Sequence, residues 1–334
     1  MRYTCVDTAE FLYPDITEYK SGTKEIKILS PRGSYACAQI LFSDVKEQNL
    51  NVKADGWNPE LYEMVPIYVE RNHGLDENNS APHMPERRAP YYLYDCIKPI
   101  ADTLNVGENG VCALYLSEWI APDAEVGVRE ASITVGDVTV AVTIEVSSVV
   151  VPDESLTMIV GYNRGTVCQY HNVELGSPEF DALDTKYLTM LRRMRQNMLY
   201  CPKPKAIPLG DNKYDFDFSA MEEFFTKAMS LGYTKFNFGI GFRRSWSAST
   251  ILVDGMESMS FECYCYLAQM LPALVSWLKE HGWLDALILG IADEPNYANA
   301  TEYRALCGLV RKLAPELKLL DAMSFGPVHG AIDI

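Results

Sequence analysis

Two adjacent carboxylates, Asp293 and Glu294, are the residues of this 334-residue chain best suited to chemistry. They follow a continuous apolar run from Ala286 to Ala292, which is typical of a parallel strand buried on both faces. Pro295 cannot continue a strand ladder, so the strand is expected to end at the pair. Adjacent side chains on a flat strand face opposite sides, but where the strand ends both can meet one substrate.

Neighbouring acids of this kind can cleave a glycosidic bond. That reaction needs a proton for the leaving oxygen and stabilisation of the positive charge that forms at the anomeric carbon. A nearby negative charge and partial burial raise the pKa of a carboxylic acid, so one acid can donate the proton while the other stays ionised. The competing interpretation is a solvated pair at the start of a loop, or an acid that caps the next helix.

Further polar and aromatic residues flank the neighbouring predicted strands. In a barrel of alternating strands and helices, the C-terminal strand ends form the rim of the active site. Aromatic side chains there can stack on a sugar ring, and amides or arginines can bind hydroxyls. For each single residue, ordinary loop packing is the competing interpretation. The residues predicted to bind substrate at this rim are Asn163, Arg164, Asn197, Arg243, Trp246 and Tyr297.

The second part of the chain, residues 153–334, alternates between apolar strands and amphipathic helices. This rhythm predicts a parallel sheet covered by helices, here a (β/α)8-type barrel that forms the catalytic domain. A complete barrel has eight strands in about 250 residues, so this domain is expected to be truncated, with only about six of them. Strands are predicted at residues 156–162, 197–201, 235–240, 286–292, 317–322 and 331–334, and helices at 179–194, 219–231, 260–280 and 300–313.

The first part, residues 1–152, carries short alternating strands separated by turns, which predicts a β-sandwich. A hairpin is expected at residues 131–146 around the turn Gly136-Asp137. The polar, proline-containing stretch 73–88 predicts a long loop. We interpret the sandwich as a support for the catalytic domain, with sugar binding as the alternative.

The composition of the chain disfavours several kinds of partner and cofactor. A net charge of -16 argues against a nucleic-acid or anionic-membrane partner. No apolar run approaches the roughly 18 residues of a membrane span, and no signal peptide is visible. Nine scattered cysteines favour a reduced, cytoplasmic protein. Five scattered histidines disfavour a zinc site, and Gly239-Ile240-Gly241 lacks the third glycine of a cofactor loop, so no metal or cofactor is predicted.

Several ordered features together resemble glycoside hydrolase family 123. They are the turn from Ala121 to Gly127, the segment from Tyr214 to Phe218, the segment Gly282-Trp283-Leu284-Asp285, and the strand end Asp293-Glu294-Pro295. The resemblance covers most of the chain from about Lys24. The family comprises β-N-acetylgalactosaminidases and uncharacterised relatives, so the resemblance implies an enzyme that removes β-linked N-acetylgalactosamine or a related N-acetylhexosamine.

The same resemblance implies a substrate-assisted, retaining mechanism. The 2-acetamido oxygen of the sugar itself attacks the anomeric carbon, which is an exception to the usual two-carboxylate scheme. Asp293 would orient and stabilise that amide, and Glu294 would act as general acid and then as general base.

Two other functions remain open at this point. A conventional two-carboxylate glycosidase would use Glu294 with a second acid such as Asp321. A non-catalytic sugar-binding protein would have an incomplete barrel. Because open strand edges invite pairing with another chain, we also expect a missing C-terminal barrel segment or a dimer partner to close the barrel.

Overall fold

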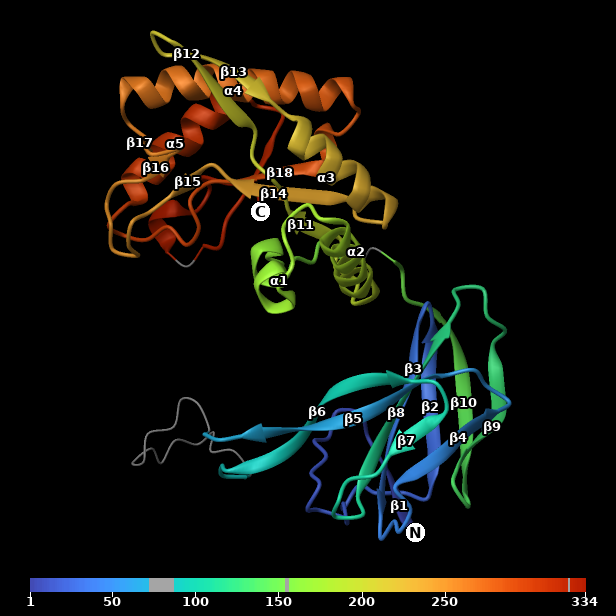
Figure 1. The fold of residues 1–334 in the computed structure, drawn as a ribbon. Helices are drawn as coiled ribbons and strands as arrows, with labels where there is room; N and C mark the ends of the chain where they lie inside the picture. The colour runs from blue at the N-terminus through green and yellow to red at the C-terminus, as the bar shows by residue number, and fades with distance from the viewer. Residues whose placement is uncertain (72–86, 154–155, 324) are drawn as a thin grey trace. The chain divides into compact units, whose positions relative to one another are not determined.

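The computed structural model describes residues 1–71, 87–153, 156–323 and 325–334 (Figure 1). The chain divides into two compact units, Met1–Asp153 and Glu154–Ile334. Each unit has its own hydrophobic core.

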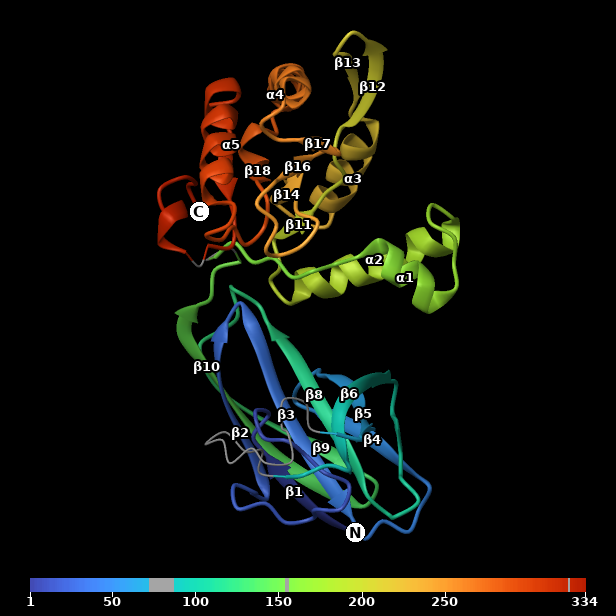
Figure 2. The same ribbon diagram turned by 90° about the vertical axis from the view of Figure 1, so that its left-hand side faces the viewer.

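The first unit is a β-sandwich of two five-stranded sheets, in the orders β1-β3-β8-β5-β6 and β2-β10-β9-β4-β7 (Figure 2). Buried side chains from both sheets, such as Ile40 and Leu114 in one and Val135 and Val142 in the other, form a single core. The strands are β1 (Arg2–Val6), β2 (Glu25–Arg32), β3 (Ser34–Ser43), β4 (Asn49–Asp55), β5 (Glu60–Val69), β6 (Tyr91–Ile100), β7 (Thr103–Asn105), β8 (Cys112–Ile120), β9 (Gly127–Val135) and β10 (Val138–Val150).

The predicted hairpin is confirmed, with longer strands than expected. Val135 of β9 pairs with Val138 of β10, so the loop is Gly136-Asp137. Gly136 has a φ of 58°, which glycine adopts without steric cost. Of the loop predicted at 73–88, residues 73–86 lie outside the described residues.

The second unit is built on a four-stranded parallel sheet in the order β11-β14-β18-β19. Its strands are β11 (Met198–Tyr200), β14 (Lys235–Gly239), β18 (Leu287–Gly290) and β19 (Lys318–Leu320). Because all four run in one direction, their C-terminal ends meet at one edge of the sheet. Four of the six predicted strands are thereby confirmed, in shorter form.

The other two predicted strands, 156–162 and 331–334, are not strands in the structure. Each borders an edge strand but makes too few bonds for a ladder. The Met158 carbonyl accepts the N–H groups of both Asn197 and Met198 at 3.2 and 3.1 Å. The Leu319 carbonyl likewise accepts those of Asp333 and Ile334 at 3.0 and 3.1 Å. The predicted barrel is therefore not confirmed, since the described residues form an open parallel sheet.

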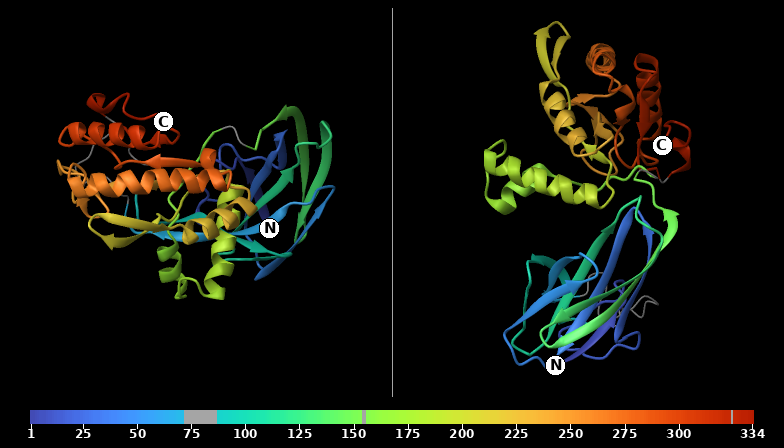
Figure 3. Two further views of the ribbon diagram at one scale, coloured as in Figure 1. Left: turned by 90° about the horizontal axis from the view of Figure 1, so that it is seen from above. Right: turned by 90° about the vertical axis from the view of Figure 1, so that its right-hand side faces the viewer.

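Helices pack against this sheet, and α4 and α5 lie side by side (Figure 3). The four predicted helices are confirmed, whereas α1 and the hairpin β12–β13 were not predicted. None of the helices that the structure describes is both long and apolar enough to cross a membrane. The helices are α1 (Arg164–His171), α2 (Pro178–Arg193), α3 (Ser219–Ser230), α4 (Phe261–Glu280) and α5 (Ala300–Leu313). The remaining strands are β12 (Lys205–Gly210), β13 (Lys213–Asp217), β15 (Gly241–Phe242), β16 (Leu252–Val253) and β17 (Met256–Glu257).

The segment between α4 and β18 ends the helix and leads the chain into the strand that precedes the two acids. Gly282 has a φ of 71°, a left-handed conformation that commonly ends a helix. Trp283 follows it and packs edge-on against Trp277 of α4, with ring centroids 5.5 Å apart. A short 3-10 turn, Leu284–Ala286, then leads directly into β18.

Candidate active site

The two candidate acids lie on a strained turn at the C-terminal end of β18. Ile291 and Ala292 are buried, whereas Asp293 and Glu294 are exposed. Their φ angles are 50° and 43°, so two consecutive residues other than glycine are left-handed. This conformation costs an L-residue about 1–2 kcal/mol, and it persists only where the surroundings enforce it. Strain of this kind concentrates at functional sites.

Asp321 holds the turn on its upstream side. It follows β19, the strand beside β18, and its Oδ2 accepts the N–H of Ala292 at 3.0 Å. The same oxygen accepts the hydroxyl of Tyr303, on α5, at 2.9 Å. Burial raises the pKa of the Asp321 carboxyl, and the negative charge of Asp293 raises it further. Burial also raises the pKa of the Tyr303 hydroxyl, and the charge of Asp321 adds to this shift.

Arg243 holds the turn on its downstream side. Its Nη2 donates a hydrogen bond to the Asp293 carbonyl oxygen, and its Nη1 donates one to the Trp246 carbonyl oxygen at 3.0 Å. The structure therefore brings Arg243 to the acids, but with its guanidinium group bonded to main-chain oxygens.

A close backbone approach places Arg243 there. Gly241 donates its N–H to the Ile291 carbonyl oxygen at 2.7 Å. A Cβ atom at Gly241 would lie 2.8 Å from that oxygen and 2.8 Å from the Ile251 side chain. Only glycine fits between these two neighbours, so the chain after β14 can run directly beside the chain after β18.

Two buried asparagines connect the same loops. Asn296 donates its side-chain N–H to the Trp246 carbonyl oxygen at 2.6 Å. Asn299 donates to the Ala248 carbonyl oxygen at 3.2 Å, and its Oδ1 accepts the N–H of Asn296 at 2.9 Å. The segment that carries Trp246 is thus fixed relative to the acids. These asparagines were not predicted as site residues, because an asparagine after a strand is also common in ordinary turns.

Trp246 and Tyr297 each pack against Phe325. The ring centroids of Tyr297 and Phe325 are 4.8 Å apart, and those of Trp246 and Phe325 are 6.2 Å apart. Trp246 is 58% exposed and Tyr297 is 71% exposed, so both rings are open to solvent. The structure brings these two predicted residues together, and Phe325 was missed because nothing in the sequence separates it from a core aromatic residue.

The structure does not place Asn197 at this edge. Asn197 directly precedes β11, so it lies at the N-terminal end of the sheet, opposite to the acids. It is 3% exposed, its Oδ1 accepts the N–H of Met158 at 2.8 Å, and its Nδ2 donates to the Leu156 carbonyl oxygen at 3.1 Å. The expectation that it lines the rim was wrong, because the start of a strand was treated like its end.

Asn163 and Arg164 have contacts of their own at the start of α1. The Oδ1 of Asn163 accepts the N–H of Thr166 at 3.0 Å and so caps the helix. The guanidinium of Arg164 forms an ion pair with Asp184 of α2. Their predicted part in sugar binding stays a prediction.

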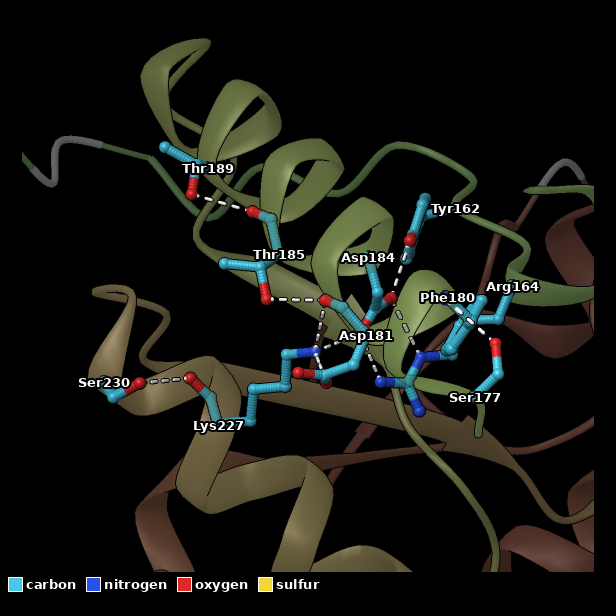
Figure 4. Close-up of polar contacts among 10 residues, drawn as sticks. All are labelled: Tyr162, Arg164, Ser177, Phe180, Asp181, Asp184, Thr185, Thr189, Lys227 and Ser230. Atoms are coloured by element: carbon cyan, nitrogen blue, oxygen red, sulfur yellow. Dashed lines mark hydrogen bonds and ion pairs between the residues drawn. The ribbon is translucent and has the colours of Figure 1, made fainter. Parts of the chain in front are cut away.

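Asp184 is the centre of a polar network that connects α1, α2 and α3 (Figure 4). Its carboxylate is fully buried and accepts bonds from Tyr162 at 2.6 Å, from Nε of Arg164 at 3.0 Å and from Lys227 at 2.8 Å. Burial alone would raise the pKa of Asp184, but the hydrogen bonds from Arg164, Lys227 and Tyr162 outweigh it and lower the pKa. In the described part of the chain, no three His, Cys, Asp or Glu side chains lie close enough together to hold a metal ion.

A comparison with solved structures found a protein of similar fold. A family 123 glycoside hydrolase from Clostridium perfringens, studied for glycolipid glycan hydrolysis, is 15% identical with a TM-score of 0.69. The match covers 97% of this chain and 64% of that one, so the present chain spans less than two thirds of the relative. An FMN-binding β-glucuronidase from Faecalibacterium prausnitzii L2-6 matches with 12% identity, over 93% of this chain and 41% of that one, at a TM-score of 0.27, which is too low to carry an argument.

No curated protein matches the chain. A family model described as the catalytic domain of glycoside hydrolase 123 does match, at residues 162–332. This range contains both acids, Arg243 and the aromatic residues of the site. Because it spans more than half of the 334 residues, the predicted resemblance is confirmed, and the chain belongs to the family of glycoside hydrolase 123 catalytic domains.

Proposed function

We propose that this protein is a glycosidase that removes β-linked N-acetylgalactosamine, or a related N-acetylhexosamine, from a glycan. The observation that carries the proposal is the pair Asp293 and Glu294, exposed on a left-handed turn between buried residues at the C-terminal end of β18. A strained, exposed acid pair at this edge costs stability and suits catalysis. Membership of the family supports the reaction class.

In the proposed mechanism the carbonyl oxygen of the 2-acetamido group attacks the anomeric carbon. The bond from that carbon to the leaving oxygen breaks, and Glu294 protonates the leaving oxygen as general acid. Asp293 accepts a hydrogen bond from the acetamido N–H and stabilises the positive charge of the oxazolinium intermediate. Glu294, now ionised, removes a proton from water as the water attacks the same carbon. The two inversions leave the anomeric configuration unchanged.

The exposed rings of Trp246 and Tyr297 are proposed to contact the apolar face of a sugar ring. Phe325 packs against both rings and limits their movement. Arg243 contributes by holding the turn, since its donors already face the Asp293 and Trp246 carbonyl oxygens.

Nitrophenyl glycosides test the proposal. The β-N-acetylgalactosaminide or the β-N-acetylglucosaminide should be cleaved, whereas the matched β-galactoside and β-glucoside should not. The Asp293→Asn variant, which should lose activity on every acetamido substrate, is the control for a contaminating enzyme. Cleavage of a glycoside without an acetamido group, and of no acetamido sugar, would contradict the substrate-assisted mechanism. Binding of N-acetylgalactosamine with no turnover of any substrate would instead favour a non-catalytic sugar-binding protein.

A two-carboxylate glycosidase is the second candidate, because Asp321 lies at the neighbouring strand end and its pKa responds to Asp293. Its oxygens are, however, engaged by Ala292, Tyr303 and its own neighbour Ala322. A carboxylate bonded in this way is a poor nucleophile, which favours the substrate-assisted mechanism.

The edge of the sheet at β19 supports one further proposal. A closed barrel of this type needs eight parallel strands, and the described sheet has four. We propose that a further barrel segment or a second copy of the chain pairs near β19, where the main-chain N–H groups of Asp333 and Ile334 share one acceptor, the Leu319 carbonyl oxygen, and form no ladder. Light scattering combined with mass spectrometry of the purified protein distinguishes the two. A monomer of 37.6 kDa that cleaves substrate unaided would contradict both.

A further inference from the structure

The carboxylate of Asp321 is built into the turn that carries the acids. It reaches across from β19 to the residue directly before Asp293, where its Oδ2 accepts the Ala292 N–H at 3.0 Å. Its Oδ1 accepts the N–H of Ala322 at 3.1 Å. A segment 29 residues later in the chain thus fixes the direction in which the acid turn leaves β18.

A second element holds Asp321 itself. The hydroxyl of Tyr303, a fully buried residue of α5, donates to Oδ2 at 2.9 Å. Tyr303 lies in the core of the second unit, so this contact connects the turn to a rigid helix. The groups that face Asp321 are Tyr303 and Cys307 on α5 and Asp293 on the turn, and none of them supplies a positive charge.

Ionisation of Asp321 is energetically unfavourable in this environment. Burial and the negative charge of Asp293 both raise its pKa, which means that both disfavour the ionised form. An asparagine could accept the Ala292 and Tyr303 hydrogen bonds through its one carbonyl oxygen, but its amide nitrogen could not accept the N–H of Ala322. A carboxylate accepts all three bonds, and the site keeps it in spite of the cost of its charge.

We propose that Asp321 is a positioning residue for the acid pair: through Ala292 it holds Asp293 in the left-handed conformation that directs its carboxylate at the substrate. This role rests on the proposed function of Asp293 and Glu294. Arg243 holds the carbonyl oxygen of Asp293 from the other side, so the strained turn is fixed at both ends. Asp321 does not touch the reacting atoms.

Three variants separate the effect of the Asp321 charge from the effects of its hydrogen bonds. Asp321→Asn keeps the size and the main acceptor, Asp321→Ala removes the contact, and Tyr303→Phe removes one donor. Asp333→Asn is the matched control. Asp333 also accepts the N–H of a residue in β19, Leu319, at 2.8 Å, and it pairs with Arg311, but it does not contact the acid turn.

The first readout is kinetic. Because small misplacement of a reacting group can cost up to about a hundredfold in rate, Asp321→Ala should lower kcat about ten- to a hundredfold with little change in KM. Asp321→Asn, which keeps the acceptor for the Ala292 N–H, should lose less of kcat than Asp321→Ala. Asp333→Asn should leave kcat unchanged. A wild-type kcat in Asp321→Ala would overturn the proposal.

The second readout does not depend on activity. Exchange of the Ala292 amide proton, followed by NMR, should be at least about tenfold faster in Asp321→Ala than in the wild type, since that amide loses its acceptor. The rate in Asp333→Asn should equal the wild-type rate. Unchanged exchange in Asp321→Ala would contradict the hold on the turn. If the wild type cleaves no glycoside, the proposed function fails, while this exchange measurement still decides whether Asp321 fixes the turn.

Discussion

The guanidinium of Arg243 donates a hydrogen bond to the carbonyl oxygen of Asp293, fifty residues later in the chain. Its second donor reaches the carbonyl oxygen of Trp246. One side chain therefore connects the turn of the acids to the segment that carries an exposed aromatic ring. Replacement of Arg243 should therefore alter both the direction of the Asp293 carboxylate and the position of the Trp246 ring.

Arg243→Lys should lower kcat about tenfold or more, because a lysine has no planar fork and cannot donate to both carbonyl oxygens in this geometry. Steady-state kinetics on an aryl β-N-acetylgalactosaminide measures this effect. Arg244→Lys is the matched control, since Arg244 is the exposed neighbour and should leave kcat unchanged. Equal losses in both variants would show that the fork has no particular role.

Replacement of Glu294 should reveal the strain in the turn. At a φ of 43° an L-residue is strained and glycine is not, so Glu294→Gly should be more stable than Glu294→Ala by about 1 kcal/mol. Urea unfolding of the two variants gives the difference, and both should be inactive. An alanine variant as stable as the glycine variant would mean that the turn is unstrained.

The two acids should respond differently to the leaving group. Glu294→Gln should lose most activity on substrates with poor leaving groups, because a good leaving group needs little protonation. Asp293→Asn should lose activity on all acetamido substrates to a similar extent, because its role is to stabilise the amide. A series of aryl glycosides of graded acidity measures both slopes. Identical slopes in the two variants would contradict separate roles.

The buried carboxylate of Asp184 should stabilise the second unit. Asp184→Ala leaves Arg164 and Lys227 without their shared acceptor and should cost about 3 kcal/mol of unfolding free energy. Asp181→Ala is the control, because Asp181 pairs with the same Lys227 but its side chain is 70% exposed. The control should cost less than about 1 kcal/mol. Equal losses would show that burial of Asp184 does not matter.

The same carboxylate predicts a dependence on pH. Its pKa is lowered in the folded state, so its contribution to stability is present above the unfolded value of about 3.9 and is lost as the pH falls through the folded pKa. The unfolding free energy of the wild type should therefore fall more steeply below about pH 4 than that of Asp184→Asn. Urea unfolding at a series of pH values measures the two slopes, and parallel curves would contradict the assignment.

Local sequence signals predicted part of this structure well. Alternation of apolar strands and amphipathic helices located α2 to α5 and all four strands of the parallel sheet. The strand before the two acids was also found, although it ends at Gly290 and not directly at the pair. These features depend on residues that are close together in the sequence, so one amino-acid sequence is enough to predict them.

Contacts between distant segments were not predictable in the same way. Asp321 and Tyr303 meet Ala292 only because β18, β19 and α5 pack together. Residues 156–162 look like a strand by composition, but their position beside β11 allows only isolated bonds. Asn197 was assigned to the rim because the start of β11 was treated like its end, although the C-terminal ends of the strands carry the acids.

The most direct test of the central claim is the rate of hydrolysis of one aryl glycoside with zero, one, two and three fluorine atoms on its 2-acetamido group. Fluorine withdraws electrons from the amide oxygen, so the oxygen becomes a poorer nucleophile with each addition. If the acetamido group attacks the anomeric carbon with the help of Asp293, kcat should fall steeply and progressively along the series. A kcat that is unchanged across the four substrates would contradict substrate-assisted catalysis by this site.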